Sequence, residues 1–131
     1  MLVSGAAIAS DNEGDAAATA FVRDVLGVEP ATSFGTNTGR LADMPFSHEL
    51  NEDIYCIERP DGLRAAGKGA KIWLRYPGSL FAAAVTNQGD NYRTVSLGVP
   101  IETVLEETDR VWILQEALDW LYNGRKPAVR R

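Results

Sequence analysis

The residues best suited to do chemistry are oxygen-bearing side chains near the start of the sequence and one acid near its end. Asp11 and Asn12 follow an apolar stretch with the composition of a strand, and Glu102 follows a second such stretch. Carboxylate and amide oxygens bind hard cations and accept hydrogen bonds from sugar hydroxyls, and paired carboxylates can cleave a glycosidic bond. We therefore take Asp11, Asn12 and Glu102 as candidate ligand residues. The alternative is that these acids cap a helix and face solvent.

The stretch "SGAAIAS", residues 4–10, predicts a tight corner between a strand and a helix. Small residues permit the sharp turn on which some α/β enzymes display a nucleophile. This corner has no nucleophile, because Ser4 lies too early in the strand and Ser10 already begins the approach to the helix. It also lacks the GxGxxG and P-loop patterns of phosphate binding. The structural alternative is that small residues let the helix pack closely against the sheet.

The corner resembles the nucleophile elbow of class I glutamine amidotransferase-like domains, which has the pattern G-x-C-x-G. Gly5 matches the first glycine, Ala7 falls on the cysteine and Ala9 replaces the second glycine. That family also carries a late F-H-P-E motif, where this chain has "GVPIETV". There Glu102 matches the glutamate and Pro100 falls on the histidine. The resemblance implies part of a flavodoxin-like α/β fold that has lost both nucleophile and base, which excludes triad hydrolysis at the corner.

A second resemblance covers nearly the whole chain and is to a segment of large secreted bacterial proteins of the xanthan lyase-like group. That segment has a VSGAYIASD-like strand and helix, a DGL turn, a Y-P strand end, an LGFPFE-like strand and a helix beginning with Arg. The matching stretches here, in the same order, are residues 3–11, 61–63, 76–77 and 97–102, followed by Arg110. The resemblance implies a secreted or periplasmic parent protein concerned with polysaccharide, and it points to no catalytic residue in this segment.

The remaining reactive side chains give weaker signals. Cys56 and His48 are each the only residue of their type, so an internal disulfide and a CxxC zinc site are excluded. We expect no metal and no cofactor, and we do not expect this pair to replace the missing triad. The faces of Trp73, Trp112 and Trp120 are suited to stacking on sugar rings, and the alternative is packing of at least one of them in the core.

Hydrophobic periodicity predicts the elements that position these residues. We expect strands over residues 2–9, 32–34, 53–58, 70–76, 80–87 and 92–99, the last two forming a hairpin, and a turn over residues 59–69. A helix is expected from the Asp11–Asp15 region to Gly27, and a second over residues 109–122. This order predicts an α/β fold with a mixed, mainly parallel sheet flanked by helices.

Each predicted helix has an expected buried face. In the first helix it consists of Ala18, Phe21, Val22, Val25 and Leu26. In the second it is a stripe of Val111, Leu114, Leu118 and Leu121, widened by Ile113, Ala117 and Trp120.

Length and composition limit the classes of function. The chain has 131 residues, enough for one domain, and its 45% apolar and 24% charged residues are typical of globular proteins. A net charge of −5 argues against nucleic-acid binding, and the basic cluster at residues 124–131 is expected to be a solvated tail. No apolar run approaches the ~20 residues of a membrane-spanning helix, so we expect no membrane partner.

We expect residues 1–131 to form a single α/β domain, an excised C-terminal portion of a larger protein. The predicted strand at residues 2–9 would then lack a neighbour, and an exposed strand edge favours pairing with another chain. The expected partners are the rest of the parent chain, a second copy bound through that edge, and carbohydrate. The predicted function is a non-catalytic accessory or structural domain. The alternatives are a carbohydrate-active hydrolase or lyase domain that uses Asp11 and Glu102, and a subunit-interaction module at the sheet edge.

Overall fold

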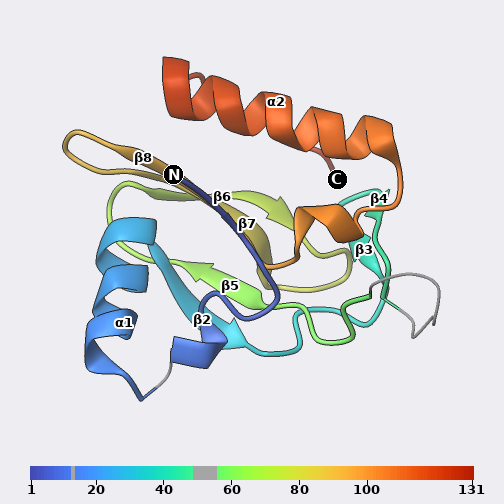
Figure 1. Cartoon of the computed structure of the whole chain (residues 1–131), viewed down its shortest axis with the longest axis horizontal. Helices are drawn as coiled ribbons and strands as arrows, with labels where there is room; N and C mark the ends of the chain where they lie inside the picture. Colours follow the sequence, from blue (N-terminus) through green and yellow to red (C-terminus); the bar gives the residue numbers. More distant parts are fainter. Residues whose placement is uncertain (13, 49–55) are drawn as a thin grey trace.

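The computed structural model describes residues 1–12, 14–48 and 56–131, which form a mixed α/β fold (Figure 1). Its helical elements are η1 (Ser10–Asn12), α1 (Ala16–Phe21), the π-helix η2 (Val22–Leu26), η3 (Ile101–Thr103) and α2 (Glu107–Asn123). Its strands are β1 (Leu2–Ser4), β2 (Val28–Thr32), β3 (Arg40–Leu41), β4 (Met44–Pro45), β5 (Gly62–Ala65), β6 (Ala70–Arg75), β7 (Ala82–Gln88) and β8 (Arg93–Leu97). Helices α1 and α2 lie on opposite sides of the main sheet (Figure 1).

The main sheet has the strand order β1-β8-β7-β5-β2, with β6 also paired to β7. The expected mixed sheet is confirmed, but the expectation that it is mainly parallel is wrong. Among the described pairs only β1 with β8 is parallel, and the others are antiparallel. Connection length explains the β6–β7 and β7–β8 pairs, because short loops between successive strands reverse the chain, whereas a parallel pair needs a long crossover.

The predicted hairpin is confirmed as β7 and β8, and residues 70–76 are confirmed as β6 apart from the final residue. The strand expected over residues 2–9 is only Leu2–Ser4, because the small residues after it form turns. The strand expected over residues 32–34 lies earlier, as β2. Residues 59–69 contain strand β5 in addition to turns. Of the strand expected over residues 53–58, residues 53–55 lie outside the described residues, and residues 56–58 are not a strand.

Helix α1 begins and ends as its sequence predicts. The Asp15 carboxylate accepts hydrogen bonds from the backbone N–H groups of Ala17 and Ala18, and Gly27 ends η2 in the left-handed conformation at φ 73°. The expected burial of Phe21 is wrong, since its side chain is 45% exposed. Val22 and Leu26 of the expected face are confirmed as buried, and both lie in the wider π-helical turn that follows.

Helix α2 packs on the sheet through only part of the face predicted for it. Val111, Leu114 and Leu118 are 43%, 39% and 47% exposed, whereas Ile113 and Ala117 are fully buried. Trp112, Trp120 and Leu121 are half-buried against the same core. Tryptophan buries more apolar area than leucine, which favours the orientation that turns both tryptophans inward.

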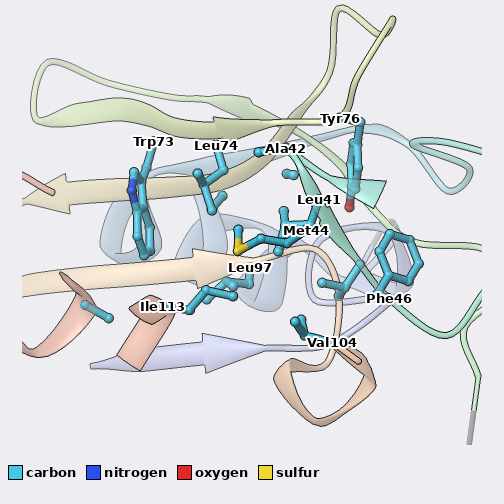
Figure 2. Packing of buried hydrophobic residues seen from close by; sticks show 14 of the residues in the cluster. Leu41, Ala42, Met44, Phe46, Trp73, Leu74, Tyr76, Leu97, Val104 and Ile113 are labelled. Atoms are coloured by element: carbon cyan, nitrogen blue, oxygen red, sulfur yellow. The ribbon is translucent and has the colours of Figure 1, made fainter. Parts of the chain in front are cut away.

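The core on the α2 side gathers side chains from elements far apart in sequence (Figure 2). Met44 and Phe46 of the β3–β4 segment meet Leu74 of β6, Leu97 of β8 and Ile113 of α2. A second cluster on the α1 side contains Val22, Leu26, Val28, Leu63 and Val85. None of the helices in the described ranges is long and apolar enough to cross a bilayer.

The C-terminal segment is mostly exposed, as expected of a solvated tail, but it is also fixed to the domain. Pro127 is buried, and the indole of Trp73 donates a hydrogen bond of 2.8 Å to the carbonyl of Ala128. The Arg130 guanidinium pairs with Asp43 and Asp109, each at 2.9 Å. The last residues of the chain therefore contact both β6, through Trp73, and α2, through Asp109.

Candidate functional site

The corner lies where two neighbouring parallel strands end. Strand β1 pairs with β8 through Ser4 and Leu97, and Gly5 N–H then donates to the Leu97 carbonyl at 3.2 Å. Ala7 follows β1 in the turn, and Pro100 follows β8 as the residue before η3. In α/β enzymes the carboxyl ends of parallel strands are the usual place for ligands. Ala7 and Pro100 both occupy this edge with side chains that cannot act as nucleophile or base.

The carboxylate of Asp61, which sequence reasoning placed only in a turn, fills the corner from inside. Asp61 is fully buried, and its Oδ2 accepts the backbone N–H of Ala9 at 2.9 Å and that of Ser10 at 3.4 Å. Its Oδ1 accepts the Ser10 hydroxyl at 2.6 Å. Backbone N–H groups at such a corner are what an oxyanion or phosphate site uses. Here these donors bind a carboxylate of the chain itself.

The backbone of Asp61 joins two more segments at the same point. The Tyr76 hydroxyl donates to the Asp61 carbonyl at 2.7 Å, and Asp61 N–H donates to the Gly98 carbonyl at 2.9 Å. A Cβ at Gly98 would overlap the Asp61 carbonyl oxygen and lie 2.8 Å from the Tyr76 hydroxyl. Only glycine fits this approach. We call Asp61 with Ala9, Ser10, Tyr76 and Gly98 the Asp61 node.

The Asp61 node unites four of the stretches that carry the xanthan lyase-like resemblance. Residues 3–11 supply Ala9 and Ser10, residues 61–63 supply Asp61, residues 76–77 supply Tyr76 and residues 97–102 supply Gly98. The fifth residue, Arg110 of α2, donates instead to the carbonyls of Val104 and Leu105. The motif residues at the node hold segments of the fold together. The motif itself was the only sequence signal for Asp61, because its partners lie about fifty residues away along the chain.

Burial governs the ionisation of the node. It raises the pKa of the Asp61 carboxyl above its ordinary value, and the nearby charge of Asp11 adds to this rise, while the hydrogen bonds from Ser10 and Ala9 oppose it. Burial also raises the pKa of the Tyr76 phenol. Perturbed pKa values are common at functional sites, but here internal hydrogen bonds account for the buried carboxylate.

The three predicted ligand residues lie on the rim outside this node. Asp11 is exposed in η1, where its N–H donates to the Ala7 carbonyl at 3.4 Å, and Glu102 is exposed in η3. Asn12 ends η1, and its side chain lies outside what the structure describes. Among the described contacts none joins Asp11 to Glu102. The proposed carboxylate site therefore stays a prediction. The described residues also contain no group of three His, Cys, Asp or Glu side chains placed to hold a metal ion.

His48 has hydrogen-bond and ring contacts that hold it in place, and Cys56 lies next to its hydrogen-bond partner, Ile57. The Nδ1 of His48 donates to the carbonyl of Ile57 at 2.9 Å, and its ring packs edge-on against Phe46. Cys56 is half-buried beside Ile57 and lies in irregular structure, not in the strand expected there. The His48 side chain thereby connects the end of the β3–β4 segment to Ile57.

The three tryptophans pack inward. Trp73 is 4% exposed and its ring centroid lies 5.9 Å from that of Trp112. The indole of Trp120 donates to the Thr94 carbonyl at 3.0 Å. Arginine side chains cover the remaining faces, Arg130 over Trp112 and Arg93 over Trp120. This arrangement favours core packing over sugar stacking for all three.

A groove of about 470 Å³ lies beside β6 and under the C-terminal segment. Its lining includes Arg75, Arg130 and Arg131, which by type would suit an anionic ligand. Arg75 already donates to the Leu80 carbonyl, and Arg130 already pairs with two carboxylates. Of the three arginines, only Arg130 has carboxylate partners, and the described contacts give Arg131 none, so the groove keeps part of its positive charge.

No family model, no curated protein and no solved structure matches this chain. The two resemblances given by the sequence therefore stay predictions.

Proposed function

We propose that this chain is a non-catalytic accessory or structural domain of a larger secreted bacterial protein concerned with polysaccharide. The observation that carries the non-catalytic part is the Asp61 node. The backbone donors of Ala9 and Ser10, which an active corner would offer to a reacting oxyanion, are bound to an internal carboxylate. In the resemblance to amidotransferase-like domains, Ala7 and Pro100 fall on the positions of the nucleophile and the base, which supports this proposal.

The proposed link to polysaccharide rests on different and more limited evidence than the non-catalytic role. It rests on the order of the short motifs in the xanthan lyase-like resemblance, and four of the five motifs meet at the Asp61 node. A motif whose residues connect the fold marks a kind of domain, not a reaction. The parent protein supplies any catalysis from other parts of its chain.

The alternative is a hydrolase or lyase domain that uses the exposed carboxylates Asp11 and Glu102. What favours it is their placement beyond the ends of β1 and β8, which are parallel neighbours. A glycosidase needs one carboxyl that stays protonated as an acid beside one that is ionised. Asp11 and Glu102 are both exposed, and among the described contacts none joins them, so the structure does not provide this pairing.

The test is a pair of assays on the purified chain. The first incubates it with xanthan and other acidic polysaccharides and follows new reducing ends and unsaturated uronic acids. The second measures binding to a glycan panel. We expect no turnover in the first. Turnover that disappears in Asp11→Ala and Glu102→Ala, but persists in Glu29→Ala as a matched acidic control, would establish the enzymatic alternative.

In the glycan assay, binding lost in the same two variants, with the fold intact, would locate a carbohydrate site on the acidic rim. Binding that both variants leave unchanged would show that these residues do not form it.

A further inference from the structure

The groove between β6 and the C-terminal segment differs in charge from the chain as a whole. Its described lining holds three arginines and no acidic residue, although the chain has a net charge of −5. Most of the rest of the lining is apolar, including Ala42, Ile72, Trp73 and Val129. A volume of about 470 Å³ lies in the range of small-molecule sites, which are typically apolar with a few polar groups.

Strand β6 is irregular where it forms one wall of this groove. Its pairing with β7 shifts register between Ile72 and Leu74, and again between Leu74 and Arg75. Regular alternation would bury every second side chain. Instead Trp73 and Leu74 are both buried, and Ile72 and Arg75 are exposed on either side of them. Such bulges re-aim side chains and are over-represented beside functional sites. In β6 they leave an apolar side chain and a cation on the same groove.

Arg75 is held in place through both its backbone and its side chain. Its carbonyl accepts the N–H of Ala42 at 3.0 Å, and its Nη1 donates to the carbonyl of Leu80 at 2.9 Å. A guanidinium has several N–H donors in a planar fork, and among the described residues no acid pairs with this one. A fixed guanidinium with unused donors suits a carboxylate, which accepts two parallel hydrogen bonds.

The opposite wall of the groove comes from the C-terminal segment. There Arg130 pairs with Asp43 and Asp109, so its charge is balanced within the fold. Arg131 is exposed and has no partner among the described contacts, and Val129 is 63% exposed. Both line the groove, so this wall repeats the combination of an apolar side chain and a cation found on β6.

We propose that this groove binds a small organic carboxylate, with the acid on the Arg75 guanidinium and an apolar or ring-shaped body against Ile72 and Val129. The apolar walls favour such a ligand over an inorganic anion, because a strongly hydrated ion gains little from contact with them. The inner wall is rigid, since Ala42 and Trp73 belong to the core on the α2 side (Figure 2). The ligand therefore meets a preformed surface.

Two sources carry this chemistry, a free apolar acid and an acidic sugar. The first is independent of the proposed function. The second rests on it, because it would make the groove the place where the domain contacts polysaccharide. The groove is distinct from the acidic rim, since neither Asp11 nor Glu102 lines it.

The first test titrates the intact chain with acids and their neutral analogues and follows backbone amide shifts by NMR. Benzoate is paired with benzamide and glucuronate with glucose, so the members of each pair differ mainly in charge. We expect saturable shifts at Ile72, Arg75 and Val129 with at least one acid. Its neutral analogue and inorganic sulfate should each bind at least tenfold more weakly. Binding of benzoate alone identifies an apolar acid as the ligand, and binding of glucuronate alone identifies an acidic sugar.

The second test changes the two walls. Arg75→Ala should weaken binding of the acid at least tenfold, and Arg75→Lys, which keeps the charge and loses the planar fork, should have an intermediate effect. Val129→Glu places a negative charge at an exposed position of the opposite wall and should also weaken binding several-fold. Arg64→Ala is the matched control, because Arg64 is exposed on β5 outside the groove. Circular dichroism checks that each variant is folded, and Val129→Glu decides if Arg75→Ala is not.

The proposal is overturned if neither acid gives saturable shifts at the groove. It is also overturned if sulfate or the neutral analogue binds as tightly as the acid, or if the folded wall variants leave the affinity unchanged. Benzoate binding in a chain that binds no glycan supports the groove site while counting against the link to polysaccharide, so the two proposals fail separately.

Discussion

The two ends of the chain are fastened to the domain in different ways. At the N-terminal corner, the buried Asp61 carboxylate accepts two backbone N–H groups and a hydroxyl. At the C-terminal end, Arg130 holds Asp43 and Asp109 on the surface and covers the ring of Trp112. The first connection is sealed from water and the second is partly exposed. Buried hydrogen bonds leave costly unpaired groups when broken, whereas water replaces exposed ones, so the two connections should differ greatly in their contribution to stability.

The largest effect is expected from removing the buried connection. Asp61→Ala leaves the Ala9 N–H buried without an acceptor and opens a small cavity. We expect a loss of about 3 kcal/mol in the free energy of unfolding. Chemical denaturation measures this value.

Asp61→Asn is the matched variant for that experiment. Its carbonyl oxygen can accept the Ala9 and Ser10 N–H groups while its amide donates to the Ser10 hydroxyl, so we expect a change within about 1 kcal/mol. If Asn is as damaging as Ala, the negative charge itself is required, and the interpretation of Asp61 as a hydrogen-bonding closure is wrong.

A slightly smaller effect is expected from crowding the same node. Gly98→Ala forces a methyl group against the Asp61 carbonyl and the Tyr76 hydroxyl, and we expect a loss of about 2 kcal/mol. Gly5→Ala, in the same corner, is the control, since its Cβ would approach only Cγ2 of Ile8, at 3.1 Å, and no backbone atom. Equal thermal midpoints for the two variants would show that the node is not tightly packed.

The surface connection should matter less. Arg130→Ala removes two ion pairs and the contact with Trp112, and we expect a loss of about 1 kcal/mol that shrinks at high salt. Arg131→Ala, at the exposed end of the same segment, should have no measurable effect. A loss at Arg130 as large as that of Asp61→Ala would remove the distinction between the two connections.

The most specific effect is a pH dependence of the buried connection alone. Burial raises the pKa of Asp61 in the folded chain above its ordinary value of about 3.9, so the folded state holds this proton more tightly than the unfolded state does. Its contribution is therefore fully present below about pH 4, and it falls as the pH rises through the raised folded pKa. Asp61→Asn should gain stability relative to the unmodified chain over that window.

The urea midpoints of the unmodified chain and of Asp61→Asn are measured from about pH 4 upward. Their difference isolates Asp61, because every other titrating group is present in both proteins. If the stability of Asp61→Asn relative to the unmodified chain falls as the pH rises through this range, the pKa of Asp61 is not raised.

Much of the fold follows from local patterns. Alternating residues predicted β6 and the β7–β8 hairpin, and Gly27 and Gly124 predicted the helix ends, because turns and caps depend on neighbours in sequence. Strand direction did not follow, because it depends on which segments meet. The buried face predicted for α2 was wrong for Val111, Leu114 and Leu118, for a related reason. Apolar residues occur on both of its sides, and only the position of the tryptophans against the sheet decides between them.

The candidate site, like the fold, could be predicted from the sequence only in part. The absence of a nucleophile at Ala7 was visible in the sequence, as was the capping role of Asp15. The role of Asp61 was not, since a turn "PDG" has the same letters whether its aspartate faces water or a core. Its partners are distant along the chain, and only the folded chain brings them together.

Hydrogen exchange at the amide of Ala9 tests the central claim most directly. The account places this N–H in a buried 2.9 Å hydrogen bond to the Asp61 carboxylate. It should therefore exchange only through large-scale opening in the unmodified chain and in Asp61→Asn, and far faster in Asp61→Ala under conditions where that variant is still folded. Fast exchange in the unmodified chain, or equal protection in all three proteins, would contradict a corner closed from within.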